Sequence, residues 1–83
     1  MNTATILTDI ARLAREQLGF DGPVQPEMRL IEDLELDSMR LFLLATEVEN
    51  HFRIRLDEGD EAELATVGDL VHVIERKLRG ATG

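Results

Sequence analysis

Ser38 is the residue of this chain whose position is best suited to carrying a chemical group. It lies in the run DLELDSM, residues 33–39, where an irregular segment ends and a helical pattern begins. The first turn of a helix has backbone N–H groups without partners and is the positive end of the helix dipole. A phosphate attached to this hydroxyl would therefore be electrostatically favoured. The local pattern alone is a weak signal for such a group, and by itself it favours Ser38 as a simple N-terminal cap.

Other residue types that carry chemistry are sparse. The chain has no cysteine, so thiol chemistry would need a cofactor. His51 and His72 are far apart in sequence, and a zinc site would need carboxylates to complete it. In the acidic segment 57–61 (DEGDE), the glycine follows the first aspartate too soon for an EF-hand calcium loop. We therefore expect no metal site and no catalytic set of serine, histidine and aspartate.

Three amphipathic helices are predicted from apolar residues that recur every three or four positions. They span residues of about 5–18, 38–52 and 67–78, and a short acidic helical segment is expected at about 57–64. Two prolines prevent a regular helix in the loop of residues 20–37. A loop of that length is usually pinned to a core, functional, or both. The predicted fold class is all-α: a small three- to four-helix bundle with a long loop between the first two helices.

Length and charge narrow the function classes. The 83 residues favour one domain, spanning residues 1–83, with a flexible tail at about 80–83. The formal net charge of -8 disfavours binding to nucleic acid and suits partners with basic surface patches. No apolar run approaches the roughly 20 residues of a membrane-spanning helix, and the N-terminus lacks a signal-peptide pattern. We expect a cytoplasmic, monomeric protein that binds no membrane.

The sequence resembles the acyl and peptidyl carrier protein family over nearly its whole length. The triplet Asp37-Ser38-Met39 is similar to the family's D-S-[LM] attachment motif. Further residues follow the family's order around it: Glu16-Gln17-Leu18-Gly19, Ile31-Glu32-Asp33-Leu34, Glu49, Phe52, Ile54, Leu56, Leu64, Thr66-Val67, Leu70-Val71 and Ile74. A three-residue motif alone would mean little, whereas the ordered set is specific. The resemblance therefore favours an attachment site at Ser38 over a cap alone.

The resemblance implies that the chain carries cargo for other enzymes and is not itself an enzyme. A phosphopantetheinyl transferase would move 4′-phosphopantetheine from coenzyme A to the Ser38 hydroxyl, and Asp37 matches the acidic residue that the transferase recognises. The terminal thiol would hold acyl or aminoacyl intermediates as thioesters, sheltered between helices or presented to a loading enzyme and to the synthases and transferases of a pathway. The missing cysteine fits, because the cofactor supplies the thiol.

The start of the second helix departs from the family pattern. Carriers of primary fatty-acid synthesis usually have acidic residues on this exposed face, and here Arg40 and Leu43 follow the serine closely. We predict that Met39, Phe42 and Leu43 form an apolar patch which, with Arg40 and Glu47, binds partner enzymes. The alternative is that Met39 and Phe42 belong to the core.

Glu35 is a second departure, since a glycine is common there in the family, and the sequence does not show its effect. The departures near Ser38 favour polyketide, specialised fatty-acid or nonribosomal-peptide-type biosynthesis, and no motif identifies the cargo. Two alternatives stay open. One is an aminoacyl or peptidyl carrier protein, and the other is a small acidic helical interaction module without a prosthetic group. An independent enzyme is disfavoured by the small size and the lack of a convergent catalytic set.

Overall fold

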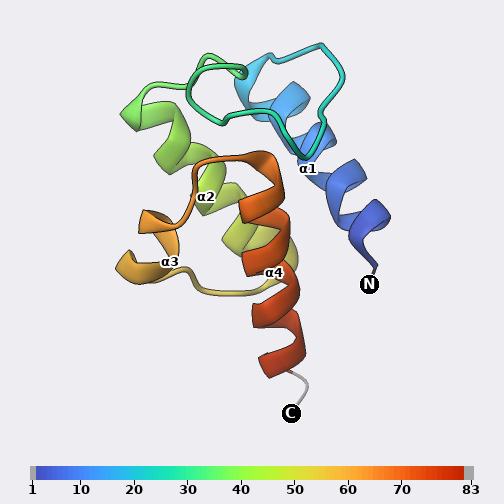
Figure 1. Ribbon diagram of the computed structural model, residues 1–83, viewed down its shortest axis with the longest axis vertical. Helices are drawn as coiled ribbons and strands as arrows, with labels where there is room; N and C mark the ends of the chain where they lie inside the picture. The colour runs from blue at the N-terminus through green and yellow to red at the C-terminus, as the bar shows by residue number, and fades with distance from the viewer. Residues whose placement is uncertain (1, 82–83) are drawn as a thin grey trace.

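Four α-helices make up the computed structural model, which describes residues 2–81 (Figure 1). They are α1 (Thr3–Leu18), α2 (Ser38–Phe52), α3 (Glu58–Ala62) and α4 (Val67–Ala81). Within these residues no strand forms, and the extended pairing is an isolated antiparallel bridge between Arg29 and Thr66. The predicted all-α fold with a long first loop is confirmed. No helix in this part of the chain is long and apolar enough to cross a membrane.

Polar caps fix the two ends of α1. Its start lies two residues before the predicted one, because Asn2 Oδ1 accepts a hydrogen bond from the Thr5 amide at 2.8 Å. Its end is the predicted one: Gly19 takes a left-handed conformation, φ +72°, and donates its N–H to the Ala14 carbonyl. Between the caps, one face of the helix is buried; its residues are Ile6, Ile10, Leu13 and Ala14.

The core lies where α1 packs against α2 and α4. From α2 it receives one apolar stripe: Leu44, Ala45, Val48 and Phe52 are buried, and Leu41 is half-buried. From α4 it receives Val67, Leu70, Val71, Val73 and Ile74. Removing this apolar surface from water is the main force that holds the helices together.

The long loop between α1 and α2 is tied to the rest of the molecule. Four of its apolar side chains are buried: Val24, Leu30, Leu34 and Leu36. Its backbone also pairs with the connection between α3 and α4, where the Leu30 amide donates to the Ala65 carbonyl at 3.0 Å and the Val67 amide donates to the Met28 carbonyl at 2.9 Å. In Figure 1 this loop crosses the end of the bundle at which α2 begins. Because the loop is held in place, it also fixes the position at which α2 begins.

Thr66 and Asp69 cap the start of α4. Thr66 Oγ1 accepts a hydrogen bond from the Asp69 amide at 3.1 Å, and Asp69 Oδ2 accepts one from the Thr66 amide at 3.0 Å. A further bond to Asp69 Oδ2 comes from the Ala65 amide. These backbone hydrogen bonds hold the pKa of Asp69 below its ordinary value, with the Thr66 amide as the largest cause.

The end of α4 differs from the prediction. The helix continues three residues beyond Leu78, to Ala81, so Gly80 and Ala81, which the sequence places in the tail, are helical. A glycine inside a helix costs only about 1 kcal/mol relative to alanine, and this helix continues through one. The remaining two residues of the predicted tail, 82 and 83, lie outside the described part of the chain.

Candidate functional site

Ser38 is the first residue of α2, and its neighbour Asp37 caps the helix. Asp37 has extended backbone geometry, and its Oδ1 atom accepts a hydrogen bond from the Arg40 amide at 2.8 Å. The Ser38 side chain is exposed and has no hydrogen-bond partner among residues 2–81. The interpretation of Ser38 as a simple N-cap is therefore wrong. Its hydroxyl is available for a reaction at the positive end of the helix.

The segment that leads into Ser38 contains one strained backbone position, which two buried side chains hold in place. Leu34 and Leu36 are buried on either side of Glu35, and the Leu36 amide donates to the Ile31 carbonyl at 3.1 Å. Glu35 takes a left-handed conformation, φ +55°. Glycine adopts this conformation without steric penalty, whereas other residues pay about 1–2 kcal/mol. This explains how the unusual residue fits: Glu35 keeps the bend that a glycine would make, and its exposed side chain stays in solvent.

A cavity of about 240 Å³ opens beside Ser38, between α2 and α3. Its lining combines one hydroxyl, one carboxylate and four apolar side chains: Ser38, Glu61, Leu41, Phe42, Ala45 and Leu64. The cavity is open to solvent, so a chain attached to Ser38 can enter it without unfolding the bundle. Of these lining residues, the sequence assigns Ser38 and Phe42 to the functional site, but it does not assign Glu61 or Leu64 to it.

The exposed face of α2 carries the predicted apolar patch. The side chains of Met39, Phe42 and Leu43 are 82%, 69% and 37% exposed, respectively, so the alternative that Met39 and Phe42 are core residues is wrong. A shallow hollow of about 510 Å³ runs over this face; its lining is Asp37, Met39, Arg40, Phe42, Leu43 and Thr46. Glu47 does not line it, and the structure places Thr46 there instead. Phe42 belongs to both the hollow and the cavity beside Ser38.

The buried carboxylate of Asp60 fixes α3 against α4. Its Oδ1 accepts from Arg76 Nη2 at 2.8 Å, and its Oδ2 lies 2.8 Å from Lys77 Nζ. Asp60 also forms a capping box with Asp57, whose Oδ1 accepts from the Asp60 amide at 2.8 Å. The hydrogen bonds from Lys77 and Asp57 lower the pKa of Asp60 from 3.8 to about 2. These contacts set the orientation of α3 and hence which of its side chains meet α2.

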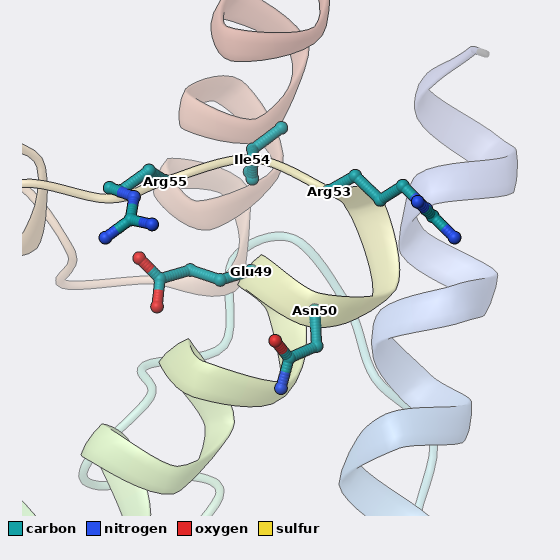
Figure 2. A pocket seen from close by; sticks show the side chains of 5 residues that line it. All are labelled: Glu49, Asn50, Arg53, Ile54 and Arg55. Atoms are coloured by element: carbon teal, nitrogen blue, oxygen red, sulfur yellow. The ribbon is translucent and has the colours of Figure 1, made fainter.

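A further hollow, of about 400 Å³, lies at the opposite end of α2 (Figure 2). Its lining is Glu49, Asn50, Arg53, Ile54 and Arg55. In Figure 2 the Arg53 side chain extends toward α1, whereas Arg55 points to the side of Glu49, so the two guanidinium groups do not converge. Glu49 Oε2 accepts a hydrogen bond from the Leu56 amide at 2.7 Å and thus holds the connector to α3. At about 1.5 Å of rise per residue, this hollow is about 20 Å from Ser38, and we assign it a structural role.

The histidines and acidic residues form no metal site in residues 2–81, where no group of three or more His, Asp or Glu side chains is placed to hold an ion. His51 Nε2 lies 3.2 Å from Asp9 Oδ2 and 3.4 Å from Arg12 Nη2, so this surface histidine has polar partners on α1. His72 is exposed on α4. Asp57 and Asp60, from the acidic segment, are used for capping and ion pairs.

Comparisons with known proteins agree with this geometry. A family model described as "Phosphopantetheine attachment site" matches residues 8–74. The acyl carrier protein of Thermotoga maritima is 38% identical over 74 residues, covering 88% of this chain and 91% of that protein. The acyl carrier protein of Exiguobacterium sp. is 35% identical over 79 residues, covering 94% of this chain and all of that protein.

A solved structure shares the fold. The crystal structure of an acyl carrier protein from Thermotoga maritima superposes with a TM-score of 0.88 at 24% identity, covering 98% of this chain and 95% of that one. At this identity the likeness shows the fold, and the sequence relatives show the family. The chain therefore belongs to the phosphopantetheine-attachment family and, within it, to the acyl carrier proteins.

Proposed function

We propose that Ser38 is the attachment point of 4′-phosphopantetheine and that this chain carries acyl groups for the enzymes of a biosynthetic pathway. One observation carries the proposal: Asp37 caps α2, which leaves the exposed Ser38 hydroxyl uncommitted at the start of the helix. In the proteins of this family the prosthetic group supplies a thiol that holds the acyl group as a thioester. This chain has no cysteine and therefore no thiol of its own.

The residues at the start of α2 fit a phosphate on Ser38. In the first turn, the amides of Ser38 and Met39 have no intrahelical acceptor, and they lie at the positive end of the helix dipole. A phosphodiester on the Ser38 oxygen would be stabilised by both features. The cap bond between Asp37 and Arg40 fixes this turn, so the hydroxyl is held in a defined position.

Asp37 has a second role in this proposal. Its Oδ1 atom is engaged by the Arg40 amide, and its exposed side chain has a second carboxylate oxygen that can receive a basic group of the transferase. The residue would then hold the helix start and mark the serine for modification. These two roles are separable by substitution, because asparagine caps helices as well as aspartate does.

The partner surface is the exposed start of α2. The patch formed by Met39, Phe42 and Leu43 adjoins Ser38, and Arg40 contributes a positive charge to it. We propose that the transferase, the loading enzyme and the synthases bind this face, with more apolar contact than the acidic faces of primary fatty-acid carriers allow. This favours a specialised pathway, of the polyketide or specialised fatty-acid type. Glu47 is half-buried farther along α2 and would lie at the rim.

The chain itself supplies no catalysis in this proposal. Glu61 is the one titratable side chain that lines the cavity beside Ser38 in the described residues, and no histidine or lysine lines it. Bond formation and cleavage at the thioester would be the work of partner enzymes. The carrier would hold the cargo, present it and return it to its cavity.

Mass analysis tests the attachment directly. The protein is incubated with coenzyme A, Mg²⁺ and a broad-specificity phosphopantetheinyl transferase, and its intact mass is then measured. We expect the gain of one phosphopantetheine group per chain and no gain for Ser38→Ala. As a matched control, Thr8→Ala removes an exposed hydroxyl of α1, one that donates to the Ala4 carbonyl and lies outside the proposed partner face, and this variant should load normally. An unmodified wild-type protein, or a modified Ser38→Ala variant, would contradict the proposal.

A further inference from the structure

Glu61 is a solvent-exposed residue without a side-chain partner in residues 2–81, and it lines an otherwise largely apolar cavity. Leu41, Phe42, Ala45 and Leu64 form the apolar part of the cavity wall. The backbone of Glu61 is used within α3, but its side chain has no hydrogen bond or ion pair with any residue in the range 2–81. An ionised carboxylate only accepts hydrogen bonds. The cavity therefore offers one strong acceptor near Ser38, the proposed attachment point, and an arm that folds back onto the protein can bring its cargo to it.

The orientation of Glu61 is set by its neighbour Asp60. The two side chains are consecutive on α3 and therefore project in directions about 100° apart. Asp60 is held toward α4 by Arg76 and Lys77, and Glu61 consequently faces the cavity against α2. Glu61 thus lines the cavity because an ion-pair network on the other side of the same helix sets the orientation of α3.

The size of the cavity limits what enters it. Its volume of about 240 Å³ corresponds to about eight water-sized groups, since one water occupies about 30 Å³ in the liquid. A short acyl group can fit, whereas a long chain would extend into solvent. Methylene groups that fill the cavity displace water from Glu61 without replacing its hydrogen bonds, and this is unfavourable. A hydroxyl or ammonium group on the acyl chain can donate to the carboxylate instead.

We propose that Glu61 determines cargo preference, so that the cavity shelters short acyl groups bearing a hydrogen-bond donor in preference to saturated alkyl groups. The inference rests on the proposed attachment at Ser38. The donor can be a hydroxyl or an amine, and the two are distinguished by separate arms of the experiment. Glu61 acts on the bound cargo and takes no part in the chemistry of loading.

The test compares the reactivity of the thioester in matched loaded forms. A transferase loads the wild-type protein from hexanoyl-, 3-hydroxyhexanoyl- or 3-aminohexanoyl-coenzyme A. The rate of cleavage by hydroxylamine is then measured and divided by the rate for the same acyl group on free pantetheine. We expect the hydroxyacyl or the aminoacyl form to be cleaved severalfold more slowly than the hexanoyl form, and the slower of the two identifies the donor. This comparison needs no substitution.

Two variants distinguish an effect of the Glu61 side chain from an effect of the overall negative charge of α3. Glu61→Leu should reverse the preference and slow cleavage of the hexanoyl form by about fourfold for each methylene group that becomes sheltered. Glu58→Leu is the matched control: Glu58 is an exposed glutamate of the same helix that does not line the cavity, and its variant should behave as wild type. Circular dichroism checks that α3 variants keep the helical fold.

The outcomes distinguish this inference from the function on which it rests. A protein that accepts no arm at Ser38 overturns both. A loaded wild-type protein that shelters the hexanoyl group as well as the donor-bearing groups overturns the inference alone. So does a Glu61→Leu variant that matches Glu58→Leu in all three loaded forms.

Discussion

The Oδ1 atom of Asp37 accepts a hydrogen bond from the Arg40 amide at 2.8 Å, so the aspartate caps α2 and the adjacent serine does not. Asp37→Asn should keep this cap, because the two residues are about equally good at the N-cap position. It should lose the charge available to the transferase. We expect folding stability within about 0.5 kcal/mol of wild type and loading at Ser38 about tenfold slower in kcat/KM.

The control for this prediction is Asp37→Ala, which loses the cap as well as the charge and should cost about 1 kcal/mol of unfolding free energy. Urea denaturation and transferase kinetics on the same preparations measure the two effects. Normal loading of Asp37→Asn would show that the aspartate acts on Ser38 only through the helix cap.

Local signals account for the parts of the fold that the sequence predicts well. The start of α2 is predicted by a polar cap followed by an apolar stripe, and these two signals lie within a few residues of each other. Where local signals compete, the prediction fails. The sequence predicts α1 from about residue 5, yet the helix begins at Thr3, because the side chain of Asn2 caps it. Gly80 resembles a helix stop, yet α4 continues through it to Ala81.

In the candidate site too, local sequence signals predict some of the residues but not those that tertiary contacts place there. Ser38 and Asp37 are evident from a short motif and the order of the surrounding anchors. Glu61 has no such signal, because the orientation of a five-residue helix depends on ion pairs between Asp60 and residues 16 and 17 positions later in the chain. The sequence did not decide whether Met39 and Phe42 lie in the core or on the surface. The start of α2 is apolar on more than one face, and the helical period does not show which of these faces is buried.

Glu35 adopts φ +55°, which predicts that Glu35→Gly is tolerated or stabilising. Relief of the left-handed conformation favours the folded state by about 1–2 kcal/mol, and the greater freedom of glycine in the unfolded chain opposes it by about 0.5–1 kcal/mol. We expect a net gain of about 0.5 kcal/mol in urea denaturation. Glu35→Ala removes the same charge but keeps the strain, and it should not gain stability. Equal effects of the two variants would mean that charge, and not backbone conformation, is responsible.

The Asp60 network predicts a stability difference that depends on pH. Hydrogen bonds from Lys77 and Asp57 lower the pKa of Asp60 to about 2 in the folded state, below its ordinary value of 3.8. Folding therefore favours the ionised form, and the stabilisation is fully present above the ordinary pKa and is lost as the pH falls through about 2. Asp60→Asn should lower the unfolding free energy at pH 7 by about 1–3 kcal/mol, because Arg76 and Lys77 lose their charged partner.

The measurement is urea denaturation of wild type and Asp60→Asn at neutral pH and at the lowest pH at which both remain folded. The difference in unfolding free energy between wild type and Asp60→Asn should become smaller as the pH falls. Glu58→Gln makes the same change of charge on an exposed side chain of α3 and should alter stability by less than about 0.5 kcal/mol. A difference for Asp60→Asn that stays constant with pH would point to lost packing instead of a lost ion pair.

Leu43 tests the proposed partner face. Its side chain is 37% exposed and lines the hollow beside Met39 and Phe42, so Leu43→Glu places a charge in the middle of the apolar patch without opening the core. If partner enzymes cover this patch, the new carboxylate must be desolvated on binding. We expect loading and acyl transfer with the native partners to fall about tenfold, mainly through a higher KM.

Asn50→Glu is the matched control, since it introduces the same charge on an exposed position of α2 near the opposite end of the helix. A carrier that binds its partners by general electrostatics would respond to both substitutions alike, because each changes the net charge by one. A carrier that binds through the apolar patch would respond only to Leu43→Glu. Unchanged rates for Leu43→Glu in a protein that still unfolds cooperatively would exclude the apolar patch from the interface with these partner enzymes.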